Sequence, residues 1–227
     1  MLNNIEYIKT IMEHKSMPKN TDLFYQVEII KRNKDIVKGD PISAIKNKEL
    51  YRNCIADVKD LEEKMPVIQE ICNKLKARAY FYYNRRSYID LALFSARRIL
   101  ETFPDSSGAA KNAWQSMFSL HPHEDKSDLL WMSDLDGLCD LTVKGIISDI
   151  RKISSDPEDP VYPMVIPTPG GCHLICKSFR KDMATGDLET LIKDGNSYKN
   201  RATVLYCPDF GINNEFEIKS DVASALV

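Results

Sequence analysis

The chain has 227 residues, of which 43% are hydrophobic and 28% charged, a composition typical of globular proteins. Its 31 basic and 33 acidic residues give a net charge of −2, which excludes the strong overall positive charge of many nucleic-acid binders. A polyanion would therefore have to meet a local basic surface. The length suits one substantial domain, or a core domain with a smaller extension.

The six cysteines include no Cys-x-x-Cys pair. Several stand in apolar, strand-like stretches, where a free cysteine behaves as a small buried hydrophobe. This usage predicts free thiols and a reducing, cytoplasmic location. No signal peptide and no apolar run long enough to span a bilayer are visible, so we expect no membrane partner.

Strands and helices alternate through the first half of the chain. Apolar residues at helical spacing predict a short helix that ends before Pro18. A later helix should begin near Pro66, because proline fits best in the first turn. The further predicted elements are strands at 23–30, 50–58 and 77–83, and helices up to about residue 76, at 87–103 and at 109–120.

The second half repeats the alternation. The predicted elements are a strand at 129–136, a helix at 141–153, hairpin strands at 162–167 and 173–178, a short helix or strand around 182–193, and a strand at 202–207. This order predicts an α/β or α+β protein of mixed sheets with flanking helices. We expect two lobes, residues 1–120 and 128–227, integrated into one domain.

An apolar run beginning at Leu129 ends in two carboxylates, Asp134 and Asp136. Residues two apart on a strand project from the same face, so both carboxylates can meet one divalent cation. Oxygen ligands suit Mg²⁺ or Mn²⁺, and two such ions can hold the attacking and leaving oxygens of a phosphoryl transfer. The alternative is a solvated Asp-Leu-Asp-Gly turn, because so short a motif recurs by chance.

A second motif joins the hairpin strands through two glycines and is followed by basic residues. Glycines allow the backbone to approach a phosphate closely, and the basic residues can supply charged donors. The alternative is an ordinary hairpin with a half-exposed histidine. The predicted nucleotide- or phosphate-binding residues are Gly170, Gly171, His173, Lys177 and Ser178.

An aromatic and basic segment, Tyr80–Tyr88, spans a predicted strand-to-helix junction. Aromatic faces can stack on bases and paired arginines can hold phosphates, a combination that binds single strands. Arg85 and Arg86 are therefore the predicted template- or phosphate-binding residues, since anion sites form at such junctions. The alternative assigns one set of aromatic residues to the core and both arginines to a solvated turn.

The order of these motifs resembles that of the archaeo-eukaryotic primase superfamily, in particular phage and plasmid primase–polymerases. An apolar strand ending in Asp-x-Asp is followed by a helix and then by Thr-Pro-Gly-Gly-Cys-His-Leu-Ile, over roughly residues 129–208. The resemblance implies an RRM-like C-terminal lobe and a nucleotidyltransferase that uses Mg²⁺ or Mn²⁺. Asp134 and Asp136 would hold the metals, and His173 would contact the phosphates of the incoming nucleotide.

The same resemblance implies nucleic acid and nucleoside triphosphates as partners, with a role in DNA replication. A replication helicase is a further candidate partner. The Lys-, Ile- and Asn-rich composition is compatible with a phage-encoded protein in the host cytoplasm.

The chain departs from the family pattern in two places. Pro-Gly-Gly (169–171) stands where the family often has a serine beside the glycines. For the third acidic metal ligand, Asp194 fits the family order best, and Asp209 and Glu189 are further candidates. If none reaches the metal, the protein would be a non-catalytic nucleotide or nucleic-acid binder. A metal-dependent nuclease, which also needs clustered acids, is the third alternative.

Overall fold

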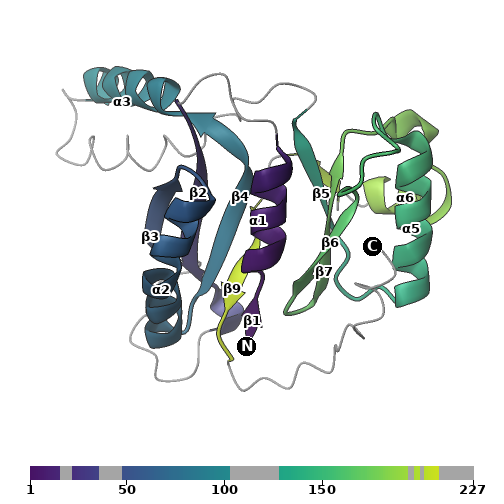
Figure 1. Cartoon of the computed structure of the whole chain (residues 1–227), viewed down its shortest axis with the longest axis horizontal. Helices are drawn as coiled ribbons and strands as arrows, with labels where there is room; N and C mark the ends of the chain where they lie inside the picture. The colour runs from purple at the N-terminus through teal and green to yellow at the C-terminus, as the bar shows by residue number, and fades with distance from the viewer. Residues whose placement is uncertain (16–21, 36–47, 103–127, 194–196, 200–201, 210–227) are drawn as a thin grey trace.

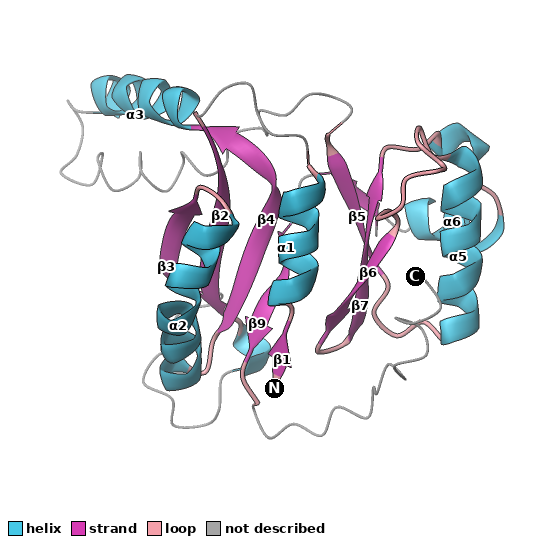
Figure 2. Ribbon diagram, in the orientation of Figure 1, coloured by secondary structure: helices cyan, strands magenta, loops and turns pink. Residues whose placement is uncertain are grey.

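Two antiparallel sheets, one of five strands and one of four, form the framework of the protein in the computed structural model (Figure 1). The structure describes residues 1–15, 22–35, 48–102, 128–193, 197–199 and 202–209. Within these residues five α-helices accompany the sheets, so the fold is α+β, as the alternating pattern predicts (Figure 2).

The five-stranded sheet gathers strands from both ends of the chain, in the order β1-β9-β4-β2-β3. Its strands are β1 (Leu2–Asn3), β2 (Leu23–Lys31), β3 (Lys48–Ile55), β4 (Arg78–Ser87) and β9 (Ala202–Cys207). The neighbouring helices are α1 (Ile5–His14), α2 (Val58–Leu75) and α3 (Tyr88–Thr102). Helices α1 and α2 pack on one face of this sheet, and α3 extends from the end of β4 (Figure 1).

The four-stranded sheet has the order β6-β7-β5-β8. Its strands are β5 (Leu130–Asp134), β6 (Met164–Thr168), β7 (Gly171–Lys177) and β8 (Ser197–Lys199). Helices α5 (Asp140–Ile153) and α6 (Gly186–Lys193) cover its outer face (Figure 1). Along the chain this unit runs strand, helix, strand, strand, helix, strand, and the first and third strands lie at its centre.

The chain enters the four-stranded sheet at β5 and leaves it after β8. Strand β9 lies within residues 128–227, yet it pairs with β1 and β4 in the five-stranded sheet. The chain therefore returns to the first sheet after completing the second. Backbone pairing over this distance leaves no local signal in the sequence, so the pattern of residues 202–207 predicts the strand but not its neighbours.

Most predicted elements are confirmed within one to a few residues at their ends. Two very short strands, β1 and β8, were not predicted, because two or three residues carry no periodicity. The helix predicted at 109–120 lies outside the described residues.

The predicted start of α2 near Pro66 is wrong, because the helix begins eight residues earlier at Val58. Asp57 caps it, accepting a hydrogen bond from the backbone N–H of Asp60 at 2.8 Å. Pro66 then lies in the helix interior, where it cannot donate to the carbonyl of Glu62. Both Pro66 and Glu62 are exposed, so water can hydrate that carbonyl.

Each face of the four-stranded sheet contributes to a different core. On β5, Leu130 and Met132 join the core that includes α1, α2 and the five-stranded sheet. The intervening Trp131 packs instead with the core under α5 and α6. This alternation follows from the two-residue period of a strand. One apolar core thus lies between the sheets, and side chains on the inner face of β5 point toward β4 and β9.

Two buried asparagines connect the sheets through hydrogen bonds to backbone. Asn4, which precedes α1, donates to the carbonyls of Pro167 on β6 and Val204 on β9, at 2.9 and 2.8 Å. Asn84 on β4 donates to the carbonyl of Leu130 and accepts from its N–H, at 2.9 and 3.0 Å. These side chains satisfy three backbone carbonyls and one backbone N–H at the core between the sheets.

Asn4 and its neighbour Asn3 provide a matched test of this link. We expect Asn4→Ala to lower the free energy of unfolding by about 2–4 kcal/mol, because two buried carbonyls lose their donor. Asn3 is exposed and its side chain accepts one local hydrogen bond, so Asn3→Ala should cost less than about 1 kcal/mol. Urea unfolding of both variants measures the difference, and equal losses would contradict the assigned role of Asn4.

Candidate functional site

The register of β5 and β7 places Asp134 directly opposite His173. The two strands are antiparallel, so opposite residues share one face of the sheet. Asp134 follows Leu130 and Met132 at two-residue steps and therefore faces the five-stranded sheet. The half-buried carboxylate of Asp134 and the ring of His173, only 8% exposed, thus belong to the same side of the sheet.

His173 reaches from one sheet to the other. Its Nδ1 lies 2.9 Å from the hydroxyl oxygen of Thr203 on β9, and Thr203 is completely buried. This hydrogen bond fixes the orientation of the imidazole ring. Thr203 was not among the predicted site residues, and its signal in the sequence is a hydroxyl within a largely apolar strand.

Asp136 lies against the turn between β6 and β7. The hydroxyl of Thr168 donates to Asp136 Oδ1 at 2.8 Å, and the N–H of Gly170 donates to the Thr168 hydroxyl oxygen at 3.2 Å. The N–H of Asp136 in turn donates to Asp134 Oδ1 at 3.2 Å. The two carboxylates and the Gly-Gly turn are therefore held together as one unit.

The two glycines of this turn make room for Asp136. A Cβ added to Gly170 would lie 2.5 Å from Asp136 Oδ2, and one added to Gly171 would lie 2.7 Å from Asp136 Cα. Gly171 also has a φ of +155°, which side-chain-bearing residues rarely adopt. The glycines are thus explained by the close approach of Asp136, whether or not a phosphate also approaches the turn.

The charge of this region affects the neighbouring thiol. Cys172 lies between Gly171 and His173 but points into the core under α5 and α6. Burial, together with the carboxylates of Asp136, Asp134 and Asp140, raises its pKa to about 12. At neutral pH the Cys172 thiol is therefore protonated, and it does not form a nucleophilic pair with His173.

Lys177 and Ser178 lie at the opposite end of β7 from His173. Four residues of strand separate Lys177 from His173, which corresponds to about 13 Å. The ammonium of Lys177 lies 3.7 Å from Asp159 and 5.7 Å from the ring centroid of Tyr162. The structure therefore brings Gly170, Gly171 and His173 together, but it does not bring Lys177 to the same place.

Arg85 and Arg86 are buried within β4, with 5% and 3% exposure, so the interpretation as a solvated turn is wrong. Arg85 lies over the ring of Tyr25 and pairs with Asp128 at 3.4 Å. Arg86 lies over the ring of Tyr82 on the other face of the sheet. Arg85 thus approaches the start of β5, whereas Asp134 stands at its end.

The aromatic residues of the same strand divide between its two faces. Phe81 and Tyr83 are completely buried in the core between the sheets. Tyr80 and Tyr82 are half-buried on the opposite face, where the hydroxyl of Tyr82 donates to Glu28 at 2.7 Å. The alternative that assigned one set to the core is therefore confirmed.

Among the described residues, no cluster of three or more His, Cys, Asp or Glu side chains is placed to hold a metal ion. Asp194, the preferred third ligand, lies outside the described residues. Glu189 lies on α6, on the outer side of the sheet, and pairs with Lys193 at 2.6 Å. Asp209 follows the end of β9 that is farther from Thr203. Asp134 and Asp136 remain the oxygen donors that could meet a cation here.

Comparisons with protein-family models, with curated proteins and with solved structures found no match for this chain. Of the helices that the structure describes, none is both long and apolar enough to cross a bilayer.

Two glycine variants test the fit of Asp136 against the turn. Gly171→Ala should lower the free energy of unfolding by about 2 kcal/mol, because the new Cβ meets the backbone of Asp136 at a strained φ. Gly145 lies in α5 with open space around it, so Gly145→Ala should raise the stability by up to about 1 kcal/mol. Thermal unfolding of both variants measures the signs, and a stabilising Gly171→Ala would contradict this geometry.

Proposed function

We propose that the protein is a metal-dependent nucleotidyltransferase of the primase–polymerase type, acting on nucleic acid with nucleoside triphosphates. The observation that carries this proposal is the juxtaposition of Asp134 with His173 across β5 and β7, with Asp136 held at the adjoining Gly-Gly turn. Acidic and imidazole groups with these positions fit a site for a metal-bound triphosphate.

The topology of the second sheet supports the proposal. Its strand-helix-strand-strand-helix-strand order, with spatial order β6-β7-β5-β8, is what a ferredoxin-like or RRM-like lobe would have. In the proposed arrangement this unit is the C-terminal lobe, and the five-stranded sheet with its helices is the other lobe. The acidic pair would then lie at the end of the first strand of the RRM-like unit, facing the space between the lobes.

Mg²⁺ or Mn²⁺ would be held by Asp134 and Asp136. Mg²⁺ is commonly bound by one or two carboxylates, with water and substrate phosphates completing its coordination, so this donor set fits. The ion would neutralise charge on the triphosphate during transfer. The hydrogen bond from Thr168 to Asp136 Oδ1 would keep that carboxylate oriented.

His173 would contact the triphosphate through Nε2, since Nδ1 is turned toward Thr203. An imidazole held by a buried hydroxyl presents its other nitrogen in a fixed direction, which reduces the entropy lost on binding. Thr203 is then a positioning residue that acts through His173. A replication helicase remains a proposed partner on the basis of the family resemblance alone.

The second candidate function is a non-catalytic nucleotide or nucleic-acid binder on the same scaffold. It is favoured by the role of Asp136 in the turn, because the contacts with Thr168, Gly170 and Gly171 account for this residue without a metal. A nuclease is the remaining alternative and would use the same acidic pair.

The main test measures Mg²⁺- and Mn²⁺-dependent incorporation of labelled nucleotides on single-stranded and primed templates. We expect the double variant Asp134→Ala, Asp136→Ala to lose at least about 100-fold in rate, because it removes the charges that stabilise the transferred phosphate. The matched control, Asp182→Ala with Asp187→Ala, removes two exposed carboxylates elsewhere and should keep wild-type activity.

Activity that survives in the folded Asp134, Asp136 variant would overturn the assignment of the metal site. Nucleotide binding without incorporation by the wild type would favour the non-catalytic binder. Shortening of the template instead of extension would favour the nuclease.

A second test addresses Thr203. Thr203→Val keeps the shape of the side chain but removes the hydrogen bond to His173, so the KM for the nucleoside triphosphate should rise several-fold with a smaller change in kcat. Thr203→Ser restores the hydroxyl and should restore the KM. If Thr203→Ser behaves like Thr203→Val, the hydroxyl is not what positions His173.

A further inference from the structure

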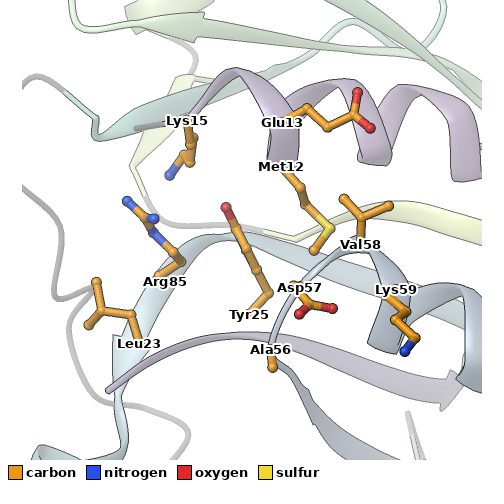
Figure 3. A pocket seen from close by; sticks show the side chains of 10 residues that line it. All are labelled: Met12, Glu13, Lys15, Leu23, Tyr25, Ala56, Asp57, Val58, Lys59 and Arg85. Atoms are coloured by element: carbon orange, nitrogen blue, oxygen red, sulfur yellow. The ribbon is translucent and has the colours of Figure 1, made fainter. Parts of the chain in front are cut away.

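A pocket of about 290 Å³ lies between the end of α1, the start of β2, the turn before α2, and β4 (Figure 3). Ligand pockets usually measure about 300–1,000 Å³, so this one is at the lower limit and suits a small molecule. Its lining contains buried cations, apolar side chains and exposed acids, which occupy different parts of the pocket.

Two cations and a phenol form the inner part of the pocket. Lys15, Arg85 and Tyr25 are 6%, 5% and 4% exposed. Figure 3 shows the ammonium, the guanidinium and the phenol oxygen directed toward a common region, although they come from α1's end, β4 and β2. The Lys15 ammonium donates to Asn84 Oδ1 at 3.3 Å, and Arg85 pairs with Asp128 at 3.4 Å, so both cations are held in place.

These three groups match the chemistry of a phosphate monoester. A guanidinium can donate two parallel hydrogen bonds to phosphate oxygens, and an ammonium supplies a compact positive charge. The phenol hydroxyl adds a polar group beside the two cations. Charge-assisted hydrogen bonds of this kind are stronger than neutral ones, and more so at a partly buried position.

The remaining wall and the rim limit what can be attached to the phosphate. Met12, Leu23 and Val58 give the pocket an apolar wall that suits an organic group such as a base. Glu13, Asp57 and Lys59 line the exposed side of the pocket, and the two carboxylates outnumber the one ammonium, so this side would repel additional phosphates. The pocket therefore favours one phosphate over a triphosphate.

This pocket is separate from the acidic site. Asn84, which holds Lys15, pairs with Leu130 at the start of β5, whereas Asp134 is the last residue of that strand, about 13 Å away. Helix α1 spans the same interval, since Asn4 before it contacts β6 and Lys15 follows its end. Ten helical residues correspond to about 15 Å.

We infer that this pocket binds a phosphate monoester of mononucleotide size, with the phosphate between Lys15, Arg85 and Tyr25 and the organic group against the apolar wall. The inference goes beyond nucleotidyl transfer at the acidic site and does not depend on it.

The experiment titrates the full chain with AMP, adenosine and ATP in the absence of divalent metal, using calorimetry. AMP should bind, adenosine should not bind measurably, and ATP should bind at least tenfold more weakly than AMP. Methyl-labelled methionine gives an independent readout by NMR, because the Met12 signal should shift on addition of AMP. Met12→Leu assigns that signal.

Lys15→Gln should weaken AMP binding at least tenfold, whereas Lys144→Gln, the same change on the exposed surface of α5, should leave it unchanged. Tyr25→Phe keeps the ring and removes only the hydroxyl, so it tests the pocket even if Lys15→Gln does not fold, and should weaken binding about five- to tenfold. The variant Asp134→Ala, Asp136→Ala should bind AMP like the wild type.

No binding of AMP, or wild-type affinity in both folded Lys15→Gln and Tyr25→Phe, would overturn the inference. Equal affinity for AMP and ATP would remove the preference for one phosphate. Loss of AMP binding in the Asp134, Asp136 variant would place the ligand at the acidic site instead. Nucleotide incorporation can fail without affecting these results, so the two proposals are tested separately.

Discussion

The side chain of Asn84 forms two hydrogen bonds with the backbone of Leu130, as a neighbouring strand would. This contact, with the equivalent one made by Asn4 at the other end of α1, fixes how the four-stranded sheet lies against the five-stranded one. Apolar packing alone is non-directional and would tolerate a slide of one sheet along the other. Buried amides are directional, because a displaced amide would leave backbone groups unsatisfied in the core. The position of His173 opposite Thr203 depends on this alignment.

The same alignment places the acidic pair and three basic residues at different ends of the space between the sheets. Asp134 and Asp136 lie at the end of β5, whereas Arg85, Lys15 and Lys177 lie toward its start. The two ends of β5 are about 13 Å apart, which exceeds the screening length of about 8 Å for charges in water at physiological salt. Charges within the protein are screened less than charges in water. Asp128 and Asp159 lie beside Arg85 and Lys177, at 3.4 and 3.7 Å, so the basic end also carries carboxylates. These basic residues therefore have acidic partners of their own, away from Asp134 and Asp136.

Local patterns predicted the local structure. The run before Asp134, the Gly-Gly turn and the helix between them are each determined by residues close in sequence, so the acidic pair and the turn that supports Asp136 could be anticipated. The pairing of β9 with β4 joins residues at least 120 positions apart, such as Tyr82 and Ala202. The contact between Thr203 and His173 depends on it and joins residues 30 positions apart on different sheets. Burial of Arg85 and Arg86 likewise depends on which strands flank β4. These pairings and burials follow from tertiary packing. Packing can also override the preference for proline in the first turn of a helix, as it does at Pro66 in α2.

The hydrogen bond between Thr168 and Asp136 bears on how the acidic pair could act. An ionised carboxylate has about four lone-pair positions, so one bond from a hydroxyl at Oδ1 leaves capacity for a metal ion on the same group. The contact therefore restricts rotation of the carboxylate and still leaves lone pairs for a metal ion. Gly170 and Gly171 restrict it from the other side, because the turn backbone lies against Asp136. A carboxylate held in this way loses little conformational entropy when it binds a cation. The turn and the acidic pair thus form one unit, in which the glycines hold Asp136 in place.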